Sequence, residues 1–404
     1  MKKKIIVLGT GFSAYRFLKK IDVKKFDITV VSPRNHFLFT PLLPSTTVGT
    51  IEFRSITEPI RNIKGIEFIQ SECININSVN NKILCMDSDT MKKYELGFDK
   101  LIIAVGETTN TFGLEGVHEH SLFLKELSDA RKIRTKVIDC FENASLPEIS
   151  EEEKNNYIRF IVCGGGPTGV EFAAELHDFI EKDIKKRYSK LAEKAEIILI
   201  EAKEKILSLF DKKLIDYTTK LFNRHEIVVK TNTYIKDIKK KTIILSNNEK
   251  IDYGLLVWAT GNTSTQLARK SGFKQTKQGK IITDYYLMVK DYDNIFAIGD
   301  CSEIENNPLP ATAQVAQQQG LFLAKFLNGK NKNKKFSYKN LGMLAYIGSE
   351  KALADLPQYK GSGFTAFLLW KSAYLTKLVS FKNKILVLFD WVKTYLFGRD
   401  VSNF

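Results

Sequence analysis

Short apolar runs, each about the length of a buried strand, recur along the chain between longer segments with helical periodicity. In the first third they occupy residues 4–8, 27–31 and 101–106, and in the middle third residues 159–163, 197–200 and 255–261. Continuous rather than alternating apolar runs are typical of parallel strands that helices cover on both faces. The pattern therefore predicts an α/β protein with two Rossmann-like units, each built on its own parallel sheet.

Glycines follow the first apolar run, where a strand passes into a helix. Residues 9–14 read GTGFSA, which fits the Gly-x-Gly-x-x-Gly/Ala spacing of a dinucleotide-binding turn. Such a turn directs backbone N–H groups and the positive end of a helix at a pyrophosphate. We therefore predict cofactor contacts from Gly9, Thr10, Gly11, Phe12 and Ser13, with a ligand-free tight turn as the alternative.

The strand at 27–31 lacks the acidic residue that usually ends the second strand of such a unit and binds the adenosine ribose. The sequence there reads Ser32-Pro33-Arg34-Asn35. We expect Arg34 or backbone groups to hold the ribose instead.

The same glycine spacing returns at residues 164–169, which read GGGPTG between the strand at 159–163 and a helical segment at 172–188. A second, correctly placed loop of this kind favours two bound dinucleotides over chance. The strand at 197–200 is followed by Glu201, whose carboxylate can accept from both ribose hydroxyls and repels a 2′-phosphate. NADH is therefore favoured over NADPH, although Lys203 and Lys205 leave NADPH open. The predicted contacts are Gly164, Gly165, Gly166, Pro167, Thr168, Gly169 and Glu201.

Three further apolar runs end in small residues, as expected where a strand passes close to a cofactor. Two of them close the two nucleotide units. The third, at 294–300, ends on an aspartate that can hydrogen-bond a ribityl hydroxyl of FAD, with a helix N-cap or turn role as the alternative. The residues concerned are Ala104, Val105, Gly106, Ala259, Thr260, Gly261, Gly299 and Asp300.

The composition changes this picture in two respects. The formal net charge of +15 favours an anionic partner such as a membrane surface or a nucleic acid, although lysine is abundant throughout the chain. The five cysteines are scattered and form no CxxC pair, which argues against a disulfide framework or a zinc site. We expect a reducing compartment and no bound metal.

Beyond residue 363 the chain becomes aromatic and basic. Apolar residues recur there at helical spacing in two segments, and residues 360–404 contain seven lysines or arginines against two aspartates. Helices of this kind lie in a membrane interface, and no run approaches the ~20 apolar residues needed to span a bilayer. Packing against a second copy of the chain is the competing interpretation, and both can hold.

Several longer strings resemble the type II, or alternative, NADH:quinone oxidoreductases. They are residues 32–45 (SPRNHFLFTPLLPS), 48–55 (VGTIEFRS), 164–171 (GGGPTGVE), 311–318 (ATAQVAQQ), 344–348 (LAYIG) and 397–400 (FGRD). The resemblance covers essentially the whole chain. It implies a glutathione-reductase-like two-dinucleotide fold with non-covalent FAD, NADH as donor, a membrane quinone as acceptor and no proton pumping.

The resemblance also assigns roles outside the glycine loops. Glu171, which we place in the first turn of its helix, is a candidate carboxylate beside the nicotinamide or a candidate for proton delivery, with complementing the helix dipole as the alternative. Gln314, Gln317 and Gln318 are expected to line the quinone site from one side of a helix, unless this side lies in solvent. Two further residues are assigned to backbone contact with the flavin: Thr40 and Pro41.

The predicted domain organisation is discontinuous. Residues 1–118 and 283–340 form the FAD-binding domain, residues 119–282 form an inserted NADH-binding domain, and residues 341–404 form a membrane-association region. We expect a homodimer bound peripherally to the cytoplasmic face of a bacterial inner membrane, with the mitochondrial inner membrane as the alternative.

Two other classes of protein stay open at this point. A sulfide:quinone oxidoreductase would need a pair of redox cysteines near the flavin, and only Cys163 and Cys301 lie near the relevant loops. A basic flavoprotein that binds nucleic acid without catalysis would also explain the charge, but the basic residues follow no nucleic-acid-binding motif.

Overall fold

The computed structural model describes residues 2–330 and 333–402, which fall into two compact units. The first unit comprises residues 1–38, 57–108 and 262–340, and the second comprises residues 39–56, 109–261 and 341–404. Residues 1, 331–332 and 403–404, which belong to the predicted segments 1–118, 283–340 and 341–404, lie outside the described part.

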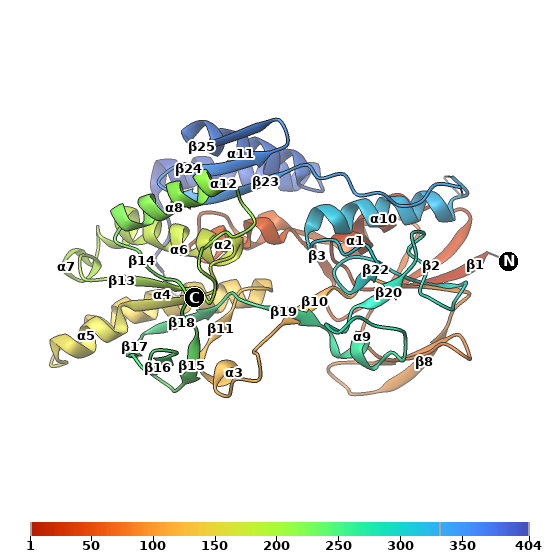
Figure 1. The fold of residues 1–404 in the computed structure, drawn as a ribbon, viewed down its shortest axis with the longest axis horizontal. Helices are drawn as coiled ribbons and strands as arrows, with labels where there is room; N and C mark the ends of the chain where they lie inside the picture. Colours follow the sequence, from red (N-terminus) through yellow and green to blue (C-terminus); the bar gives the residue numbers. More distant parts are fainter. Residues whose placement is uncertain (1, 331–332, 403–404) are drawn as a thin grey trace. The chain divides into compact units, whose positions relative to one another are not determined.

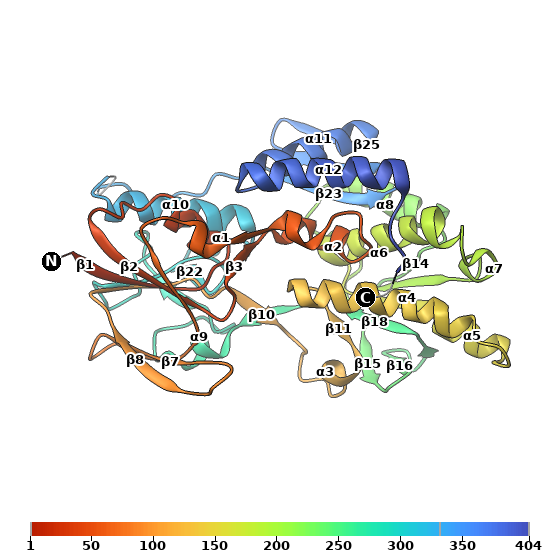
Figure 2. The ribbon, with the colours of Figure 1, turned by 180° about the vertical axis from the view of Figure 1, so that it is seen from behind.

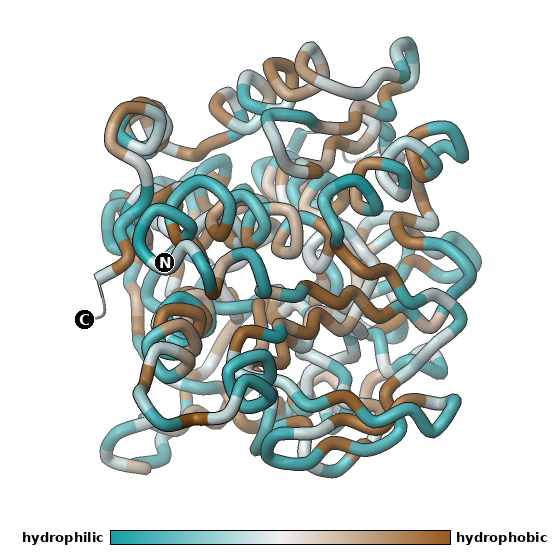
Figure 3. Tube along the Cα trace, turned by 90° about the vertical axis from the view of Figure 1, so that its left-hand side faces the viewer, coloured by the Kyte–Doolittle hydropathy of each residue, from teal (hydrophilic) through white to brown (hydrophobic). Residues whose placement is uncertain are grey.

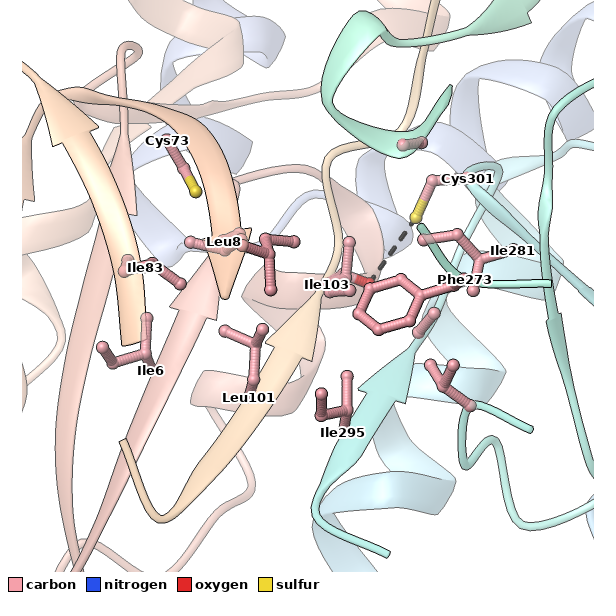
Figure 4. Close-up of a cluster of buried hydrophobic side chains, with 14 of the residues drawn as sticks. Ile6, Leu8, Cys73, Ile83, Leu101, Ile103, Phe273, Ile281, Ile295 and Cys301 are labelled. Carbon is pink, nitrogen blue, oxygen red and sulfur yellow. Dashed lines mark hydrogen bonds between the residues drawn. The ribbon is translucent and has the colours of Figure 1, made fainter. Parts of the chain in front are cut away.

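A five-stranded parallel sheet forms the centre of the first unit, in the order β21-β9-β1-β2-β5. Strands β1 and β2 of this sheet are labelled in Figure 1. Strand β21 and most of β1, β2 and β9 are apolar and buried, as the continuous runs predict, whereas the edge strand β5 exposes Glu67 and Gln70. Figure 4 shows the core on this sheet, where Ile6 and Leu101 pack together and the Cys301 thiol donates to the Ile103 carbonyl. The strands are β1 Lys3–Leu8, β2 Phe26–Ser32, β5 Glu67–Gln70, β9 Lys100–Ile103 and β21 Ile295–Ala297.

Two helices, α1 (Phe12–Leu18) and α10 (Ala313–Leu327), lie side by side against this unit (Figures 1 and 2). Gly320 permits the close approach, because a Cβ added there would lie 2.2 Å from the Ser13 carbonyl oxygen. The remaining elements of the unit are β3 His36–Leu38, β4 Thr57–Pro59, η3 Ile60–Asn62, β6 Glu72–Asn77, β7 Lys82–Met86, β8 Lys93–Gly97, β10 Glu107–Thr109, β19 Asn262–Ser264, α9 Gln266–Lys270, β20 Ile281–Thr283 and β22 Ser302–Ile304.

The second unit contains the second parallel sheet, in the order β11-β18-β12-β13-β14. Two parallel sheets in separate units confirm the predicted fold class. The strands are β11 Leu122–Phe123, β12 Arg159–Cys163, β13 Glu196–Ile200, β14 Val228–Lys230 and β18 Leu255–Trp258. An antiparallel sheet adds β15 Ile235–Ile238, β16 Thr242–Leu245 and β17 Lys250–Asp252. The helical segments of the second unit before residue 340 are η1 Thr40–Leu42, α2 Leu43–Thr46, η2 Phe53–Ile56, α3 Val117–His120, α4 Leu127–Ala144, α5 Glu151–Tyr157, α6 Pro167–Phe179, the π-helix η4 Ile180–Ile184, α7 Ser189–Ala192 and α8 Lys212–Arg224.

The predicted pair of C-terminal helices is confirmed as α11 (Phe364–Lys377) and α12 (Phe381–Phe397). They follow an antiparallel sheet of β23 (Met343–Gly348), β24 (Lys351–Leu356) and β25 (Tyr359–Gly363), which α11 covers (Figure 2). Within residues 2–330 and 333–402, no helix has the length and apolar character needed to cross a membrane. In the hydropathy view of Figure 3, continuous brown, apolar stretches of the trace contrast with coiled stretches that alternate between brown and teal.

Candidate functional site

The first glycine loop leaves β1 at the carboxyl end of the sheet, as the sequence predicts. Gly9 has a φ of +105°, and a Cβ added there would lie 2.3 Å from the Ala104 carbonyl oxygen, so the strand end admits only glycine. Gly11 caps α1, and a Cβ added to it would meet nothing within 4 Å. The loop therefore presents bare backbone to open space at a helix N-terminus, which suits a pyrophosphate.

Arg34 contacts Thr10, which is part of this loop. The Thr10 hydroxyl donates to the Arg34 carbonyl (3.2 Å), and Arg34 Nε donates to Thr10 Oγ1 (3.4 Å) and to the His36 carbonyl (3.1 Å). Thr10 Oγ1 also lies 3.4 Å from Ser32 Oγ. The segment that replaces the usual acidic residue after β2 is thus connected directly to the glycine loop.

The carboxyl ends of β9 and β21 lie at the same edge of the sheet as the end of β1, because β9 pairs in parallel with β1 and β21 pairs in parallel with β9. Gly106 has a φ of +67°, and a Cβ added there would meet nothing within 4 Å. Gly299 has a φ of +79°, and its Cβ would lie 2.7 Å from Ser13 Oγ. Asp300 follows in the turn after β21, partly buried. The structure therefore gathers these residues at the carboxyl ends of adjacent strands, where α/β sheets bind nucleotides.

The glutamines of α10 differ in their surroundings. Both polar atoms of Gln318 bind the Lys339 backbone, since Nε2 donates to its carbonyl and Oε1 accepts from its N–H, each at 2.9 Å. Gln314 accepts from the Tyr338 hydroxyl (3.5 Å), and Gln317 is half-buried. The three predicted glutamines are therefore on one helix, but the side chains of Gln314 and Gln318 already form hydrogen bonds with Tyr338 and Lys339.

Gln319 is a residue that sequence reasoning missed. Its side chain is buried, and its Oε1 accepts from the Gly299 N–H at 2.6 Å. This bond ties α10 to the loop before Asp300. The only sequence signal was an uninterrupted run of glutamines, which does not show which member faces inward.

The second glycine loop repeats the geometry of the first. Gly164 has a φ of +118°, and its Cβ would lie 2.9 Å from the Ala259 carbonyl oxygen. Gly166 caps α6 with open space around it, Pro167 is the first residue of that helix, and a Cβ on Gly169 would lie 1.9 Å from the Gly164 carbonyl oxygen. The last glycine therefore lets α6 pack directly on the loop.

Glu201 reaches this loop from the end of β13. Its Oε2 accepts from the Gly165 N–H (2.7 Å) and its Oε1 from the Lys203 N–H (2.8 Å). Thr260 and Gly261 close the unit at the end of β18, and a Cβ on Gly261 would lie 2.6 Å from the Phe112 ring, a neighbour that the sequence did not suggest. The carboxylate is thus fixed beside the bare backbone that a second dinucleotide would approach.

Glu171 is the fifth residue of α6 and so lies beyond its first turn, which corrects the predicted placement and removes the helix dipole as its explanation. The side chain is buried, and the Tyr346 N–H donates to Oε1 at 3.1 Å. Burial raises the pKa of Glu171 to about 8, and the nearby Glu175 carboxylate adds to the rise. Glu171 is therefore a protonated acid at neutral pH.

A buried ionic network lies one turn further along α6, and sequence reasoning did not foresee it. Glu175 accepts from the hydroxyls of Ser45 (2.6 Å) and Thr50 (2.7 Å) and lies 3.4 Å from the Arg399 guanidinium. Arg399 also pairs with Asp183 at 3.0 Å. The arginine of the string FGRD thus joins the C-terminal segment to α6.

Thr40 and Pro41 belong to the second unit, where they begin η1, and Thr40 is exposed. The glycine loop at residues 9–13 belongs to the first unit. The predicted flavin contacts are therefore distributed over both units.

The α12 helix is attached by the polar residues Asn383 and Asp390 together with buried Val387 and Trp391, and it exposes its other large apolar residues. The Asp390 carboxylate accepts from the Ser55 hydroxyl (2.5 Å) and the Glu52 N–H (3.0 Å), and Asn383 Nδ2 donates to the Ser55 carbonyl (2.9 Å). The residues predicted to form its apolar face point outward: Ile385, Leu388, Phe389 (61% exposed), Val392, Tyr395 (82% exposed) and Leu396.

The cysteines are all reduced and buried. Cys163 lies in the second unit and Cys301 in the first, and burial raises the pKa of the Cys301 thiol to about 12. In the part of the chain that the structure describes, no group of three or more His, Cys, Asp or Glu side chains could hold a metal ion.

Comparison with known proteins gives a consistent result. Residues 3–320 match the pyridine nucleotide-disulphide oxidoreductase family, and residues 340–400 match the NDH2 C-terminal domain. A probable NADH dehydrogenase of Dictyostelium discoideum is 46% identical over all of this chain and 91% of its own length. The external NADH-ubiquinone oxidoreductase 2 of Saccharomyces cerevisiae, a mitochondrial protein, is 41% identical over 99% of this chain and 82% of its own length. The structure of NDH2 from Plasmodium falciparum in complex with NADH superposes with a TM-score of 0.95, at 33% identity and full coverage of both chains.

Proposed function

Because the chain belongs to the type II NADH dehydrogenases (NDH2), within the pyridine nucleotide-disulphide oxidoreductases, we propose that it oxidises NADH through bound FAD and reduces a membrane quinone to quinol. The observation that carries this proposal is the pair of glycine loops, each at the carboxyl edge of its own parallel sheet. At Gly11 and Gly166 an added Cβ would enter open space, which is the space that a pyrophosphate needs. Electron transfer between two dinucleotides is the chemistry that such a pair supports.

The residues of the first unit fit FAD. Gly11 and Gly106 would present bare backbone to the pyrophosphate, Gly9 allows the loop to pass close to Ala104, and Arg34, which contacts Thr10 of the loop, would hold the adenosine ribose. Asp300 would accept from a ribityl hydroxyl. When bound, FAD accepts a hydride from NADH and passes two electrons to the quinone.

The residues of the second unit fit NADH. The Glu201 carboxylate, held by the Gly165 and Lys203 N–H groups, is placed to accept from the adenosine ribose hydroxyls and to repel a 2′-phosphate. This supports NADH over NADPH as the donor.

Quinone reduction also needs protons, and Glu171 is suited to deliver one. It is protonated at neutral pH because of its burial, and its pKa of about 8 lies close enough to neutrality for release and recovery. Among the α10 glutamines, Gln317 is the best candidate to bind a quinone carbonyl, because both polar atoms of Gln318 already bind Lys339. No route for proton translocation across a membrane enters this mechanism.

We further propose that α12 attaches the protein to a membrane surface. The helix turns most of its aromatic and aliphatic residues outward, while Asn383, Asp390 and the buried Val387 and Trp391 hold it from the inner side. Lysines nearby favour anionic lipid. Because the yeast relative is named mitochondrial, we propose a mitochondrial membrane over a bacterial one. The competing occupant of this face is a second copy of the chain.

The function is tested by spectroscopy of the purified protein. We expect flavin absorbance that NADH bleaches and that a soluble quinone restores. Replacement of Glu201 by Gln should reduce the preference for NADH over NADPH. Absence of flavin from the purified protein, or bleaching that quinone does not reverse, would refute the proposal. A protein that instead shifts DNA in a salt-dependent manner and carries no NADH oxidation would be the basic binding protein.

The membrane proposal is tested by the double substitution Phe389→Ser and Leu396→Ser. We expect loss of sedimentation with anionic liposomes at unchanged flavin content. Val79→Ser is the matched control, since Val79 is an isolated apolar residue of the first unit with 89% exposure. If the double variant binds liposomes normally but changes from dimer to monomer, the face is a subunit interface.

A further inference from the structure

A cleft of about 580 Å³ opens in the second unit and is lined mainly by residues of α6, η4, α11 and α12. A cleft of this size can hold a small molecule or a lipid headgroup. Its floor is the buried ionic network described above, in which Arg399 pairs with Glu175 and Asp183. Asp178, also part of the lining, accepts a hydrogen bond from the Tyr346 hydroxyl. The buried carboxylates are therefore already supplied with donors, and the groups that can bind a ligand are those at the rim.

The rim carries two lysines from the segment that follows α6. Lys182 Nζ lies 4.0 Å from Asp178 Oδ2, at the outer limit of an ion pair, and its side chain is 48% exposed. Lys186 is exposed and, among the residues that the structure describes, forms no ion pair. The rim carboxylates are Glu350 and Glu181, and a neighbouring lysine already pairs with Glu181 at 3.3 Å. The accessible charge at this side of the cleft is therefore positive.

Lys371 adds a third ammonium group, from α11. Its Nζ lies 4.6 Å from the centroid of the Phe367 ring and 4.9 Å from that of the Trp391 ring. Removal from water lowers the pKa of Lys371, because the aromatic rings replace only part of the lost hydration. An anion in the cleft would supply the missing stabilisation through charge-assisted hydrogen bonds.

The cleft continues into the outward face of α12. Tyr395, Leu396 and Phe397 line it and are 82%, 63% and 82% exposed. A ligand that joins an anionic group to long apolar chains would satisfy the lysines and cover these side chains at once, whereas a free phosphate would leave them in water. Basic pockets beside helices at a membrane surface bind lipid headgroups in this way.

We propose that this cleft binds the phosphate group of an anionic membrane phospholipid, an inference that rests on the proposed membrane attachment by α12. Lys182 and Lys186 donate to the phosphate oxygens from the rim, and Lys371 contributes its charge from α11. The acyl chains lie against the outward residues of α12. The site thereby selects anionic lipid and fixes the orientation of the C-terminal helices at the membrane surface.

The test measures binding of phosphatidylglycerol to the full-length, flavin-loaded protein in a neutral detergent by native mass spectrometry, with phosphatidylcholine as the comparison. A neutral detergent has no charged surface, so diffuse attraction to a membrane does not contribute. We expect the wild type to bind one phosphatidylglycerol per chain in preference to phosphatidylcholine. The double substitution Lys182→Gln and Lys186→Gln should weaken this binding about 10-fold or more, the effect of losing at least one charge-assisted hydrogen bond. Glycerol 3-phosphate, which carries the phosphate without the chains, should not displace the lipid at equal concentration.

Lys377→Gln with Lys384→Gln is the matched control, because it removes the same charge from α11 and α12 at positions that do not line the cleft. It should leave the binding of phosphatidylglycerol unchanged. Equal weakening in the two double variants, unchanged binding in the cleft variant, equal affinity for the two lipids, or displacement by glycerol 3-phosphate would each overturn the inference. A wild-type protein that does not sediment with liposomes would instead refute the proposed membrane attachment, so the two failures are distinguishable.

Discussion

Replacing Glu171 with Gln tests whether burial keeps this acid protonated. The substitution preserves shape and an oxygen that accepts from the Tyr346 N–H, but it removes the ability to ionise. In the wild type, burial raises the pKa of Glu171 from 4.5 to about 8. Between these values the folded state holds a proton that the unfolded state has released, so stability falls as pH rises.

The slope gives the expected size of the effect. One bound proton corresponds to about 1.4 kcal/mol of unfolding free energy per pH unit. Between pH 6 and pH 8 the Gln variant should therefore gain about 2.3 kcal/mol over the wild type, because the slope falls as the folded state loses its proton near pH 8, and the gain levels off above pH 8. The contribution of the buried acid is complete below pH 4.5 and is lost as pH passes through 8.

Tryptophan fluorescence during denaturant unfolding is a suitable assay, because the three tryptophans, Trp258, Trp370 and Trp391, all lie in the unit that contains Glu171. Glu181→Gln is the control, since Glu181 is an exposed partner of Lys185. Parallel stability curves for wild type and Glu171→Gln across this pH range would show that the carboxyl ionises near its ordinary value, and the argument for proton delivery would be lost.

Three further outcomes follow from the site. Arg399→Ala should lower the free energy of unfolding of the second unit by about 3–5 kcal/mol, because it leaves Glu175 and Asp183 as buried charges without their cation. Denaturant titration followed by tryptophan fluorescence measures this change. A loss below about 1 kcal/mol, which is typical of an exposed ion pair, would contradict it. Gln317→Ala should slow flavin reoxidation by quinone while NADH reduces the flavin at the wild-type rate, as stopped-flow absorbance reports; slower reduction would remove Gln317 from the quinone site. Glu171→Gln should make quinone turnover insensitive to pH around 8, whereas wild-type turnover should fall as pH rises through that value; two profiles with the same fall would assign the titration to another group.

The sequence predicts the two nucleotide units well because their signals are local. The strand expected at 159–163 is β12, Arg159–Cys163, and the run at 4–8 lies within β1, Lys3–Leu8. Both loops are recognisable in the sequence from the spacing of their glycines, and the first glycine of each, Gly9 and Gly164, has a positive φ in the structure. The helix expected at 172–188 instead begins at Pro167 and ends at Phe179, because Pro is favoured as the first helical residue and the chain then continues as a π-helix.

The rest depends on contacts between distant residues. Periodicity shows that α12 has an apolar stripe, but which side faces the protein is decided by bonds from Asp390 and Asn383 to residues more than 300 positions earlier. The small antiparallel strands β23–β25 were missed, although the apolar run Met343–Gly348 has the composition of a buried strand.

The Arg399 network also bears on the order in which the chain can fold. Glu175 and Asp183 are synthesised long before Arg399, and Ser45 and Thr50 earlier still, so the second unit is assembled from three separated stretches of sequence. Until residue 399 emerges, two carboxylates of α6 and η4 lack the cation that permits their burial. We therefore expect α6 and η4 to pack fully only once residue 399 is available, and a chain interrupted before Arg399 to be cleaved more readily by proteases around these helices.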